Sequence, residues 1–209
     1  MPLELASTGS YREYPDRAAF DVSTAMSASI WARWTAAPGV GRTVVFGRYA
    51  GSIATSGAWY IGTNNGTIRF AFDTSAGSDE PGSVTPVLGR WYHLAATWVS
   101  SISATVRIWV DGVPSAASTN SGSMGALATA IRVGESTAGA DHAACQVAHA
   151  GFWNVELRAD DVQALAAGMP PHHVRPDALI IADELDARSI DTIGMIRGTE
   201  AGNVQDVPW

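Results

Sequence analysis

Apolar and polar residues alternate with a period of two along most of the chain. Between Met26 and Trp34, every second residue is apolar and most of the residues between them are polar. This alternation is typical of a strand in an antiparallel sheet with one buried face. Strand-like runs also occur at residues 43–48, 59–63, 67–73, 90–99, 105–110, 131–134 and 146–153. Strands that recur at such short intervals, with turn residues between them, predict an all-β antiparallel sandwich.

Turn and helix signals complete this outline. Asn64-Asn65-Gly66 and Asp111-Gly112 contain residues that accept the positive φ of a tight turn, so both are predicted to follow strands. Residues 159–167 break the strand pattern, because apolar residues recur there at helical spacing. Two aspartates occupy the first turn of this segment and Gly168 follows its end. We predict one short α-helix at residues 159–167.

After this helix, the sequence no longer shows regular alternation of apolar and polar residues. Met169-Pro170-Pro171 stops the helix, and the pair His172-His173 predicts an exposed loop rather than a zinc site. An apolar strand is expected around residues 179–182, followed by an acidic and less patterned tail. We therefore predict a sandwich domain at residues 1–171 and a C-terminal extension at residues 172–209. The arm of this extension is expected to pack on the sandwich or on a neighbour.

Composition excludes several classes of protein. The 209 residues carry a formal net charge of −7, which argues against a nucleic-acid binder. The cations are all arginines, so Schiff-base and phosphate-loop chemistry that needs lysine is excluded. Cys145, the single cysteine, lies among small apolar residues and is expected to be a buried thiol. No signal peptide and no run of about 18 apolar residues is visible, so no membrane association is expected.

Five segments resemble a known family in consistent order. Residues 91–98 (WYHLAATW) and 106–112 (VRIWVDG) are similar to two consecutive strands of the laminin-G-like and pentraxin-like branch of the concanavalin A-like sandwiches. Residues 29–32, 131–134 and 147–154 resemble further strands, and Leu157 with the helix resembles the close of that domain. The resemblance covers roughly residues 15–170 and implies a concanavalin A-like jelly roll.

The residues that carry the resemblance are expected to have structural roles. They form a core motif of Trp91, His93, Thr97, Trp98, Trp109, Asp111, Gly112, Trp153 and Leu157. Trp91, Trp98 and Trp109 are expected to fill the space between two sheets that pack about 10 Å apart. His93 is expected to be a core histidine that donates to a backbone carbonyl. Asp111-Gly112 is expected to be a turn and not a metal ligand.

No catalytic site is predicted. The glycanase relatives of this fold place closely spaced carboxylates on one strand, and no strand-like run here has such a set. The densest acidic cluster is Asp183-Glu184 with Asp186, which we interpret as solvated or arginine-paired surface.

The resemblance leaves one cofactor open. Many of these relatives hold Ca²⁺ with oxygen ligands on loops at a sandwich edge. Acids that could converge from loops here are Asp73, Asp79, Glu80, Glu135 and Asp141. His149, however, occupies a position in the closing strand that is often acidic in the family. Structural calcium is therefore an open alternative, and no other cofactor or metal is expected.

The leading hypothesis is a non-catalytic binding or assembly protein. It resembles laminin-G-like proteins of bacteriophage virions, which implies capsid decoration or a place in the tail. Its partners would be other virion proteins, copies of itself or a host surface glycan. The alternative is a cellular lectin-like carbohydrate-binding module, cytoplasmic or exported without a visible signal peptide, with calcium optional. A glycanase is the third hypothesis. Trp31 and Trp59-Tyr60 are candidates for stacking on a sugar, with core packing as the competing interpretation.

Overall fold

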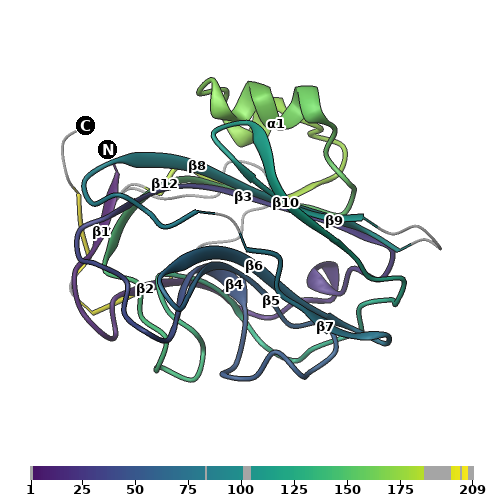
Figure 1. Cartoon of the computed structure of the whole chain (residues 1–209), viewed down its shortest axis with the longest axis horizontal. Coiled ribbons are helices and arrows are strands. Elements are labelled where there is room, and N and C mark those ends of the chain that lie inside the picture. Colours follow the sequence, from purple (N-terminus) through teal and green to yellow (C-terminus); the bar gives the residue numbers. More distant parts are fainter. Residues whose placement is uncertain (1, 83, 101–104, 186–198, 203, 207–209) are drawn as a thin grey trace.

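The chain forms two antiparallel sheets stacked face to face (Figure 1). The computed structural model describes residues 2–82, 84–100, 105–185, 199–202 and 204–206. Sheet A has the strand order β10-β9-β8-β3-β12-β1-β15, and β13 also pairs with β12. Sheet B has the order β14-β2-β11-β4-β5-β6-β7. The all-β antiparallel sandwich predicted from the alternation is confirmed.

The strands have the following bounds. In sheet A they are β1 (Leu3–Leu5), β3 (Ala25–Trp34), β8 (Trp91–Val99), β9 (Thr105–Val110), β10 (Val113–Thr119), β12 (Cys145–Trp153), β13 (Leu179–Asp183) and β15 (Val204–Asp206). In sheet B they are β2 (Tyr11–Tyr14), β4 (Arg42–Arg48), β5 (Trp59–Asn64), β6 (Thr67–Thr74), β7 (Gly77–Asp79), β11 (Ile131–Val133) and β14 (Thr199–Ala201). The helical elements are α1 (Ala159–Ala166) and the 3₁₀ turns η1 (Ala18–Phe20) and η2 (Pro171–His173).

Each strand-like run of the sequence corresponds to an observed strand, within one or two residues at the ends. The strands that the pattern did not predict are β1, β2, β7, β10, β14 and β15. Five of these have only three or four residues, which is too short to show a period. The sixth, β10, lies at the edge of sheet A, where its side chains are mostly exposed and no buried face enforces alternation.

Aromatic rings fill the space between the sheets. Trp59 of sheet B stacks on Phe152 of sheet A with 5.2 Å between ring centroids, and Phe46 meets Trp59 edge-on at 5.3 Å. Trp98 is fully buried in the same cluster, as expected. Burial of each such ring stabilises the fold by roughly 1.5–3 kcal/mol.

Figure 1 shows α1 on the outer side of sheet A, and a second apolar cluster lies between this helix and the sheet. It contains Trp109, Trp153, Leu157, Val162 and Leu165. The expectation that Trp109 and Trp91 fill the space between the sheets was therefore wrong. Trp91 and Trp98 are seven residues apart on β8, so their side chains point to opposite faces, and Trp91 is half-buried on the outer one.

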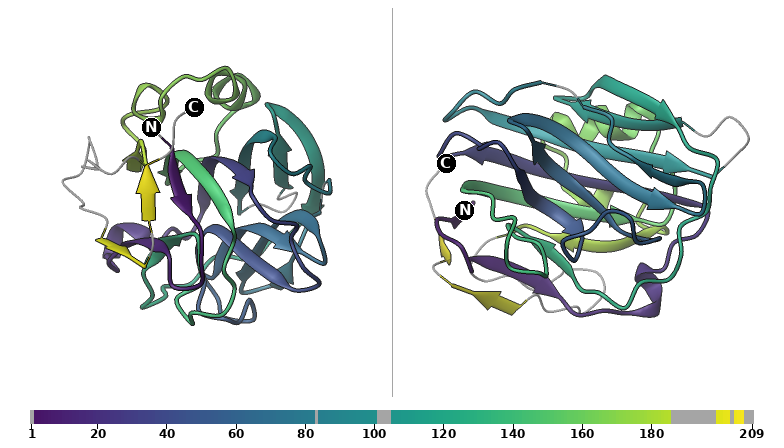
Figure 2. Two further views of the ribbon diagram at one scale, coloured as in Figure 1. Left: turned by 90° about the vertical axis from the view of Figure 1, so that its left-hand side faces the viewer. Right: turned by 60° about the horizontal axis from the view of Figure 1, so that its bottom comes forward.

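The C-terminal extension completes both sheets. β13, the strand expected around residues 179–182, pairs with β12, and Ile181 joins the core between the sheets. Figure 2 shows the last two strands, β14 and β15 (yellow), beside the N-terminal β2 and β1 (purple). Residues on both sides of position 171 thus share one core, although the division there into domain and extension stays a prediction. None of the helices in the described part of the chain has the length and apolar character needed to cross a membrane.

Asp183 corrects one expectation about the surface. Its carboxylate accepts hydrogen bonds from Arg12 (3.0 Å) and Tyr14 (2.6 Å), and its side chain is 1% exposed. Asp183 is therefore paired with an arginine, as expected, but it is buried and not on the surface. It is the last residue of β13, and its side chain contacts Arg12 and Tyr14 of β2. Asp186 lies outside the described residues. His172 and His173 lie in η2, where His172 is half-buried and His173 exposed.

Candidate functional site

Several residues of the core motif make hydrogen bonds on the outer face of sheet A, the face that α1 covers. His93 is fully buried, and its Nε2 lies 2.8 Å from the Ser29 hydroxyl rather than against a backbone carbonyl as expected. Burial lowers its pKa to about 3, so the imidazole is neutral. The His93 backbone N–H donates to Asp111, which begins the predicted turn with φ of +51° and also pairs with Arg90.

The remaining motif residues fix α1 and its connector to sheet A. Trp109 Nε1 donates to the Thr97 hydroxyl at 3.2 Å, and Trp153 Nε1 donates to the Val174 carbonyl at 2.8 Å. The Leu157 N–H donates to Ser27 at 2.8 Å. Gly112 leaves room for the helix, because a Cβ there would lie 3.1 Å from that of Ala166. These contacts are structural.

The five acids considered for calcium do not come together as a metal site. Among the described residues, no group of three or more His, Cys, Asp or Glu side chains could hold a metal ion. Glu135 accepts a hydrogen bond from the Gly9 N–H at 3.2 Å, and burial raises the pKa of Asp73. Within the described residues, the five acids therefore do not form the carboxylate cluster on which the calcium alternative depended.

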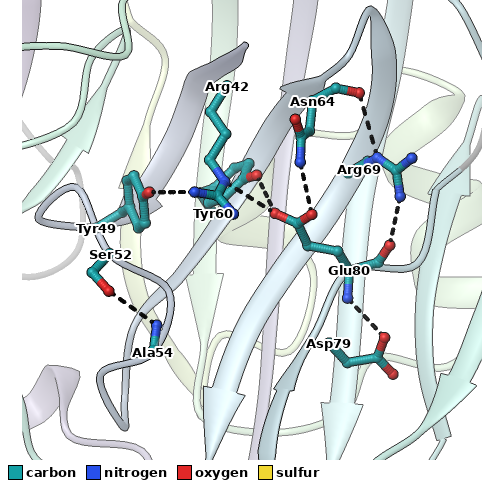
Figure 3. A network of polar contacts seen from close by, with 9 residues as sticks. All are labelled: Arg42, Tyr49, Ser52, Ala54, Tyr60, Asn64, Arg69, Asp79 and Glu80. Carbon is teal, nitrogen blue, oxygen red and sulfur yellow. Dashed lines mark hydrogen bonds and ion pairs between the residues drawn. The ribbon is translucent and has the colours of Figure 1, made fainter.

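A small polar pocket lies on the outer face of sheet B. Its volume is about 240 Å³, and it is lined by Arg42, Ile53, Ser78, Asp79 and Glu80. Arg42 is the first residue of β4, Ile53 lies in the loop after Tyr49, and residues 78–80 lie at the end of β7. Figure 3 shows Arg42, Asp79 and Glu80 from this set. We call it the Glu80 pocket.

Three side chains converge on the Glu80 carboxylate (Figure 3). The Tyr60 hydroxyl donates to Oε1 at 2.7 Å, and Asn64 Nδ2 donates to Oε2 at 2.8 Å. The Arg42 Nε donates to Oε1 at 3.3 Å, and its Nη1 reaches the Tyr49 hydroxyl at 3.5 Å. The carboxylate is thereby fixed at the mouth of the pocket, with 22% of its side chain still exposed.

The local fold places these groups by backbone geometry. The turn Asn65-Gly66 has φ of +51° and +72°, and this two-residue connection lets β5 end at Asn64 beside the start of β6. Arg69 on β6 donates to the carbonyls of Glu80 (2.9 Å) and Asn64 (3.4 Å), and so ties the two segments together. One guanidinium therefore holds the backbone at Glu80 next to the end of β5.

The electrostatics of the pocket favour an ionised Glu80. Burial disfavours the charged form, but the hydrogen bonds from Tyr60 and Asn64 and the charge of Arg42 outweigh it, so the pKa of Glu80 lies below its ordinary value. A general acid for glycoside cleavage needs a raised pKa instead. Glu80 is therefore suited to accept hydrogen bonds rather than to donate a proton.

The aromatic candidates for sugar stacking have different positions. Trp59 is 1% exposed and packs in the core, so core packing is the correct interpretation for this ring. Tyr60 is fully buried beneath the pocket and contributes its hydroxyl. Trp31 is half-buried on the outer face of sheet A. The sequence indicated Glu80 as an acid in a loop, but it did not indicate Arg42 or Asn64 as site residues. The one local signal was that Asn64 precedes a predicted turn.

Comparison with known families agrees with this architecture. Residues 6–163 match the family model of the concanavalin A-like lectin/glucanases superfamily, in its laminin-G form. The chain belongs to this superfamily. No curated protein matches it by sequence.

Solved structures show the same superfamily fold at low sequence identity. A protein from Bacteroides ovatus assigned to carbohydrate binding has a TM-score of 0.72 and 15% identity, covering 99% of this chain and 60% of its own. The heptameric SAP-like pentraxin of Limulus polyphemus has a TM-score of 0.53 and 12% identity, covering 88% and 91%. The binding domain of botulinum neurotoxin DC, in complex with SialylT, has a TM-score of 0.51 and 12% identity, covering 70% and 36%. At these identities the likeness establishes the fold alone.

Proposed function

We propose that this member of the superfamily is a non-catalytic carbohydrate-binding module and that the Glu80 pocket is its site. The carrying observation is the fixed, ionised Glu80 beside Arg42 in a pocket open to solvent. Sugar hydroxyls both donate and accept hydrogen bonds. Glu80 offers them a charged acceptor, and the Arg42 guanidinium, 35% exposed at the pocket wall, offers N–H donors. Charge-assisted bonds of this kind are roughly twice as strong as neutral ones.

The size of the pocket limits the ligand. Pockets for drug-sized molecules usually have volumes of roughly 300–1,000 Å³, so about 240 Å³ suits a single sugar unit, such as a chain end or a branch. The carbohydrate binding assigned to the Bacteroides ovatus protein and the SialylT complex of the neurotoxin domain support the proposal. This chain spans only 60% and 36% of those two chains, so their whole-protein activities are not carried over.

Removal of the Glu80 charge tests the site. A glycan array identifies the ligand of the full chain, and titration calorimetry then compares the wild type with Glu80→Gln. We expect binding to weaken by about tenfold or more, because the charged acceptor is lost while the shape is kept. Glu156→Gln is the matched control, since Glu156 pairs with Arg107 outside the Glu80 pocket.

The same titrations discriminate between the alternatives. Equal affinity of Glu80→Gln and wild type, with unchanged thermal unfolding, would show that the sugar binds elsewhere. Binding that disappears with a chelator would support the calcium-dependent lectin. Hydrolysis of a polysaccharide that a single Glu or Asp substitution abolishes would establish a glycanase and overturn the non-catalytic assignment.

A narrower proposal concerns where the module acts. We propose that it acts in a bacteriophage capsid or tail, with other virion proteins or copies of itself as partners. The support for this proposal is the sequence resemblance to laminin-G-like proteins of bacteriophage virions. Mass spectrometry of purified particles tests this placement. Presence of the chain in stoichiometric amounts supports the virion, whereas its presence only in cell extracts or secreted material favours the cellular lectin-like module.

A further inference from the structure

A second pocket, with aliphatic walls, lies at one end of sheet A. Its volume is about 330 Å³, close to the lower limit of the range of roughly 300–1,000 Å³ that is usual for ligand pockets. It is lined by the segment 84–90 between β7 and β8, by Tyr92 of β8, by the end of β9 and by the start of β10. We call it the Tyr92 pocket, and it shares no lining residue with the Glu80 pocket.

The walls of the Tyr92 pocket expose large apolar side chains to solvent. Val87 is 60% exposed, Val113 is 62% exposed and Val84 is 41% exposed, and all three line the pocket. Single exposed apolar side chains are ordinary, but a group of them around one hollow marks a place where something binds. The other large apolar side chains exposed in the described part of the chain are Val40, Leu88 and Met169.

Hydrogen bonds of the backbone hold two of these valines in place. The Val84 carbonyl accepts the Ile68 N–H of β6 at 2.9 Å. The Val87 N–H donates to the Tyr92 hydroxyl, also at 2.9 Å. The segment that forms this wall is thus tied to β6 and to β8, so a ligand does not have to order it on binding.

The innermost part of the pocket is continuous with the apolar core. Tyr92 belongs to the core cluster between the sheets, and Val110 packs against that cluster. The Tyr92 ring meets the buried Trp34 ring edge-on, with 6.1 Å between centroids. An aliphatic chain in the pocket therefore extends the core packing outward and removes valine surface from water.

The charged side chain of the pocket is a cation. The Arg90 guanidinium lies 4.5 Å from the centroid of the Tyr92 ring, and 57% of its side chain is exposed. Its Nη2 donates to Asp111 at 2.6 Å, which fixes one edge of a group that has five N–H donors. The Tyr92 hydroxyl accepts the Val87 N–H and so has its own proton to donate. No Asp or Glu is among the described residues that line the pocket.

We propose that the Tyr92 pocket binds an aliphatic carboxylate, a medium-chain fatty acid such as octanoate. The hydrocarbon chain packs among Val84, Val87 and Val113, and the carboxylate accepts hydrogen bonds from Arg90 and the Tyr92 hydroxyl. The observation that selects this class is an aliphatic pocket whose lining carries a guanidinium and no acid. This binding goes beyond the proposed carbohydrate binding and does not depend on the Glu80 pocket.

Three probes with the same chain length test the head group. Calorimetric titration of the full chain compares octanoate, octanol and octylammonium, each below its micellar concentration. We expect saturable binding of octanoate that is about tenfold tighter than that of octanol, because only the carboxylate makes charge-assisted hydrogen bonds with Arg90. Octylammonium should bind most weakly. Absence of saturable octanoate binding, or equal affinity for octanoate and octylammonium, would overturn the proposal.

Valine methyl signals locate the bound probe. Spectra of the ¹³C-labelled full chain, with Val87→Ala and Val113→Ala for assignment, should show saturable shifts at Val87 and Val113 with octanoate. Val40 is 91% exposed and does not line the pocket, so its signals should stay unchanged. Equal shifts at Val40 would indicate non-specific binding and overturn the site.

Substitutions separate the role of the cation from that of the walls. Arg90→Gln should weaken octanoate binding by about tenfold and leave octanol binding unchanged, whereas Arg17→Gln, at an exposed position outside the pocket, should change neither. Val87→Asn should weaken both probes, and Val40→Asn is its matched control. Unchanged octanoate affinity in Arg90→Gln or in Val87→Asn would overturn the proposal.

A final probe distinguishes a free fatty acid from the end of a peptide. Acetyl-leucine carries a carboxylate beside a short branched chain, as a peptide terminus does. Tighter binding of octanoate supports the fatty acid, because the longer chain covers more of the valine surface. Tighter binding of acetyl-leucine would overturn the fatty acid as the occupant and assign the pocket to a peptide terminus.

Discussion

At the scale of single residues, arginine is the main polar connector of this protein. Arg48 is 1% exposed, and its side chain has five N–H groups. Nε donates to the Thr129 carbonyl, and Nη1 donates to the Phe20 carbonyl and to Asp21. Nη2 donates to Asp16 and to the Leu127 carbonyl. One buried side chain therefore joins β4 to η1 and to the loop that precedes β11.

Arg48→Lys tests the importance of this geometry. Lysine keeps the charge but has three donors on one atom, so carbonyls from two separated segments lose their partners. We expect a loss of roughly 2–4 kcal/mol in the free energy of unfolding, measured by urea denaturation. Arg17→Lys, an exposed change beside η1, should leave that free energy unchanged. If Arg48→Lys lowers the free energy of unfolding by less than about 0.5 kcal/mol, the hydrogen bonds of Arg48 do not have the structural importance assigned to them here.

At the scale of elements, a buried charged cluster joins the C-terminal strands to sheet B. Arg12 on β2 pairs with Asp183 on β13 and with Glu200 on β14. Asp183 also accepts the Leu185 N–H at 2.7 Å, which turns the chain immediately after β13. Three elements distant in sequence thus meet at one guanidinium.

The substitution Asp183→Asn should weaken the contact between β2 and β13 at this charged cluster. The change removes the charge opposite Arg12 and turns an acceptor into a partial donor, so we expect a loss of about 3–5 kcal/mol in unfolding free energy. Thermal and urea unfolding measure it. Asp177→Asn, at an exposed position of the same extension, is the control. Adding Arg12→Met to Asp183→Asn should recover part of the loss, because the buried guanidinium that has lost one of its two carboxylate partners is then removed. A further, additive loss would contradict this explanation.

The sequence predicted the strands in which apolar residues recur at every second position. In β3 and β8 these residues are the inner side chains, such as Ile30 and Leu94, which belong to the core between the sheets. The same alternation could not show that Trp109 lies under α1, because both faces of sheet A are covered and an indole suits either. The Glu80 pocket could not be predicted from the sequence either, because its residues are distant from one another along the chain. Arg42 and Glu80 are 38 residues apart, and only the pairing of β4, β5 and β6 brings them together.

At the scale of the whole molecule, the Glu80 pocket lies on the outer face of sheet B. Figure 1 shows α1 on the outer face of the other sheet, sheet A. The aromatic core lies between the two sheets, so a short ligand in the pocket does not contact α1.

Stability of the whole molecule should depend on pH through the buried His93 and the half-buried His142 and His149. Burial lowers the pKa of His93 to about 3 and also lowers those of His142 and His149. Below the unfolded value of about 6.5, the unfolded chain binds protons that the folded chain does not, so stability is full above pH 6.5 and falls as the solution is acidified. Urea unfolding at pH 7.0, 6.0 and 5.0, above most carboxylate titration, should show this decline.

A variant isolates the contribution of His93. His93→Gln keeps a polar group near Ser29 but cannot titrate, so the decline between pH 7 and pH 5 should become shallower than in the wild type. An identical slope in the two proteins would show that His93 is protonated in the folded state or that its environment relaxes.

The pairing of β1 has a consequence for how the polypeptide is made. Leu3 lies opposite Val147 on one side and Asp206 on the other, so this strand finds both partners only among segments synthesised much later. During translation it waits with unsatisfied backbone groups while most of the chain emerges from the ribosome. Addition of β1 to sheet A is therefore a late step, which follows the synthesis of β12 and β15.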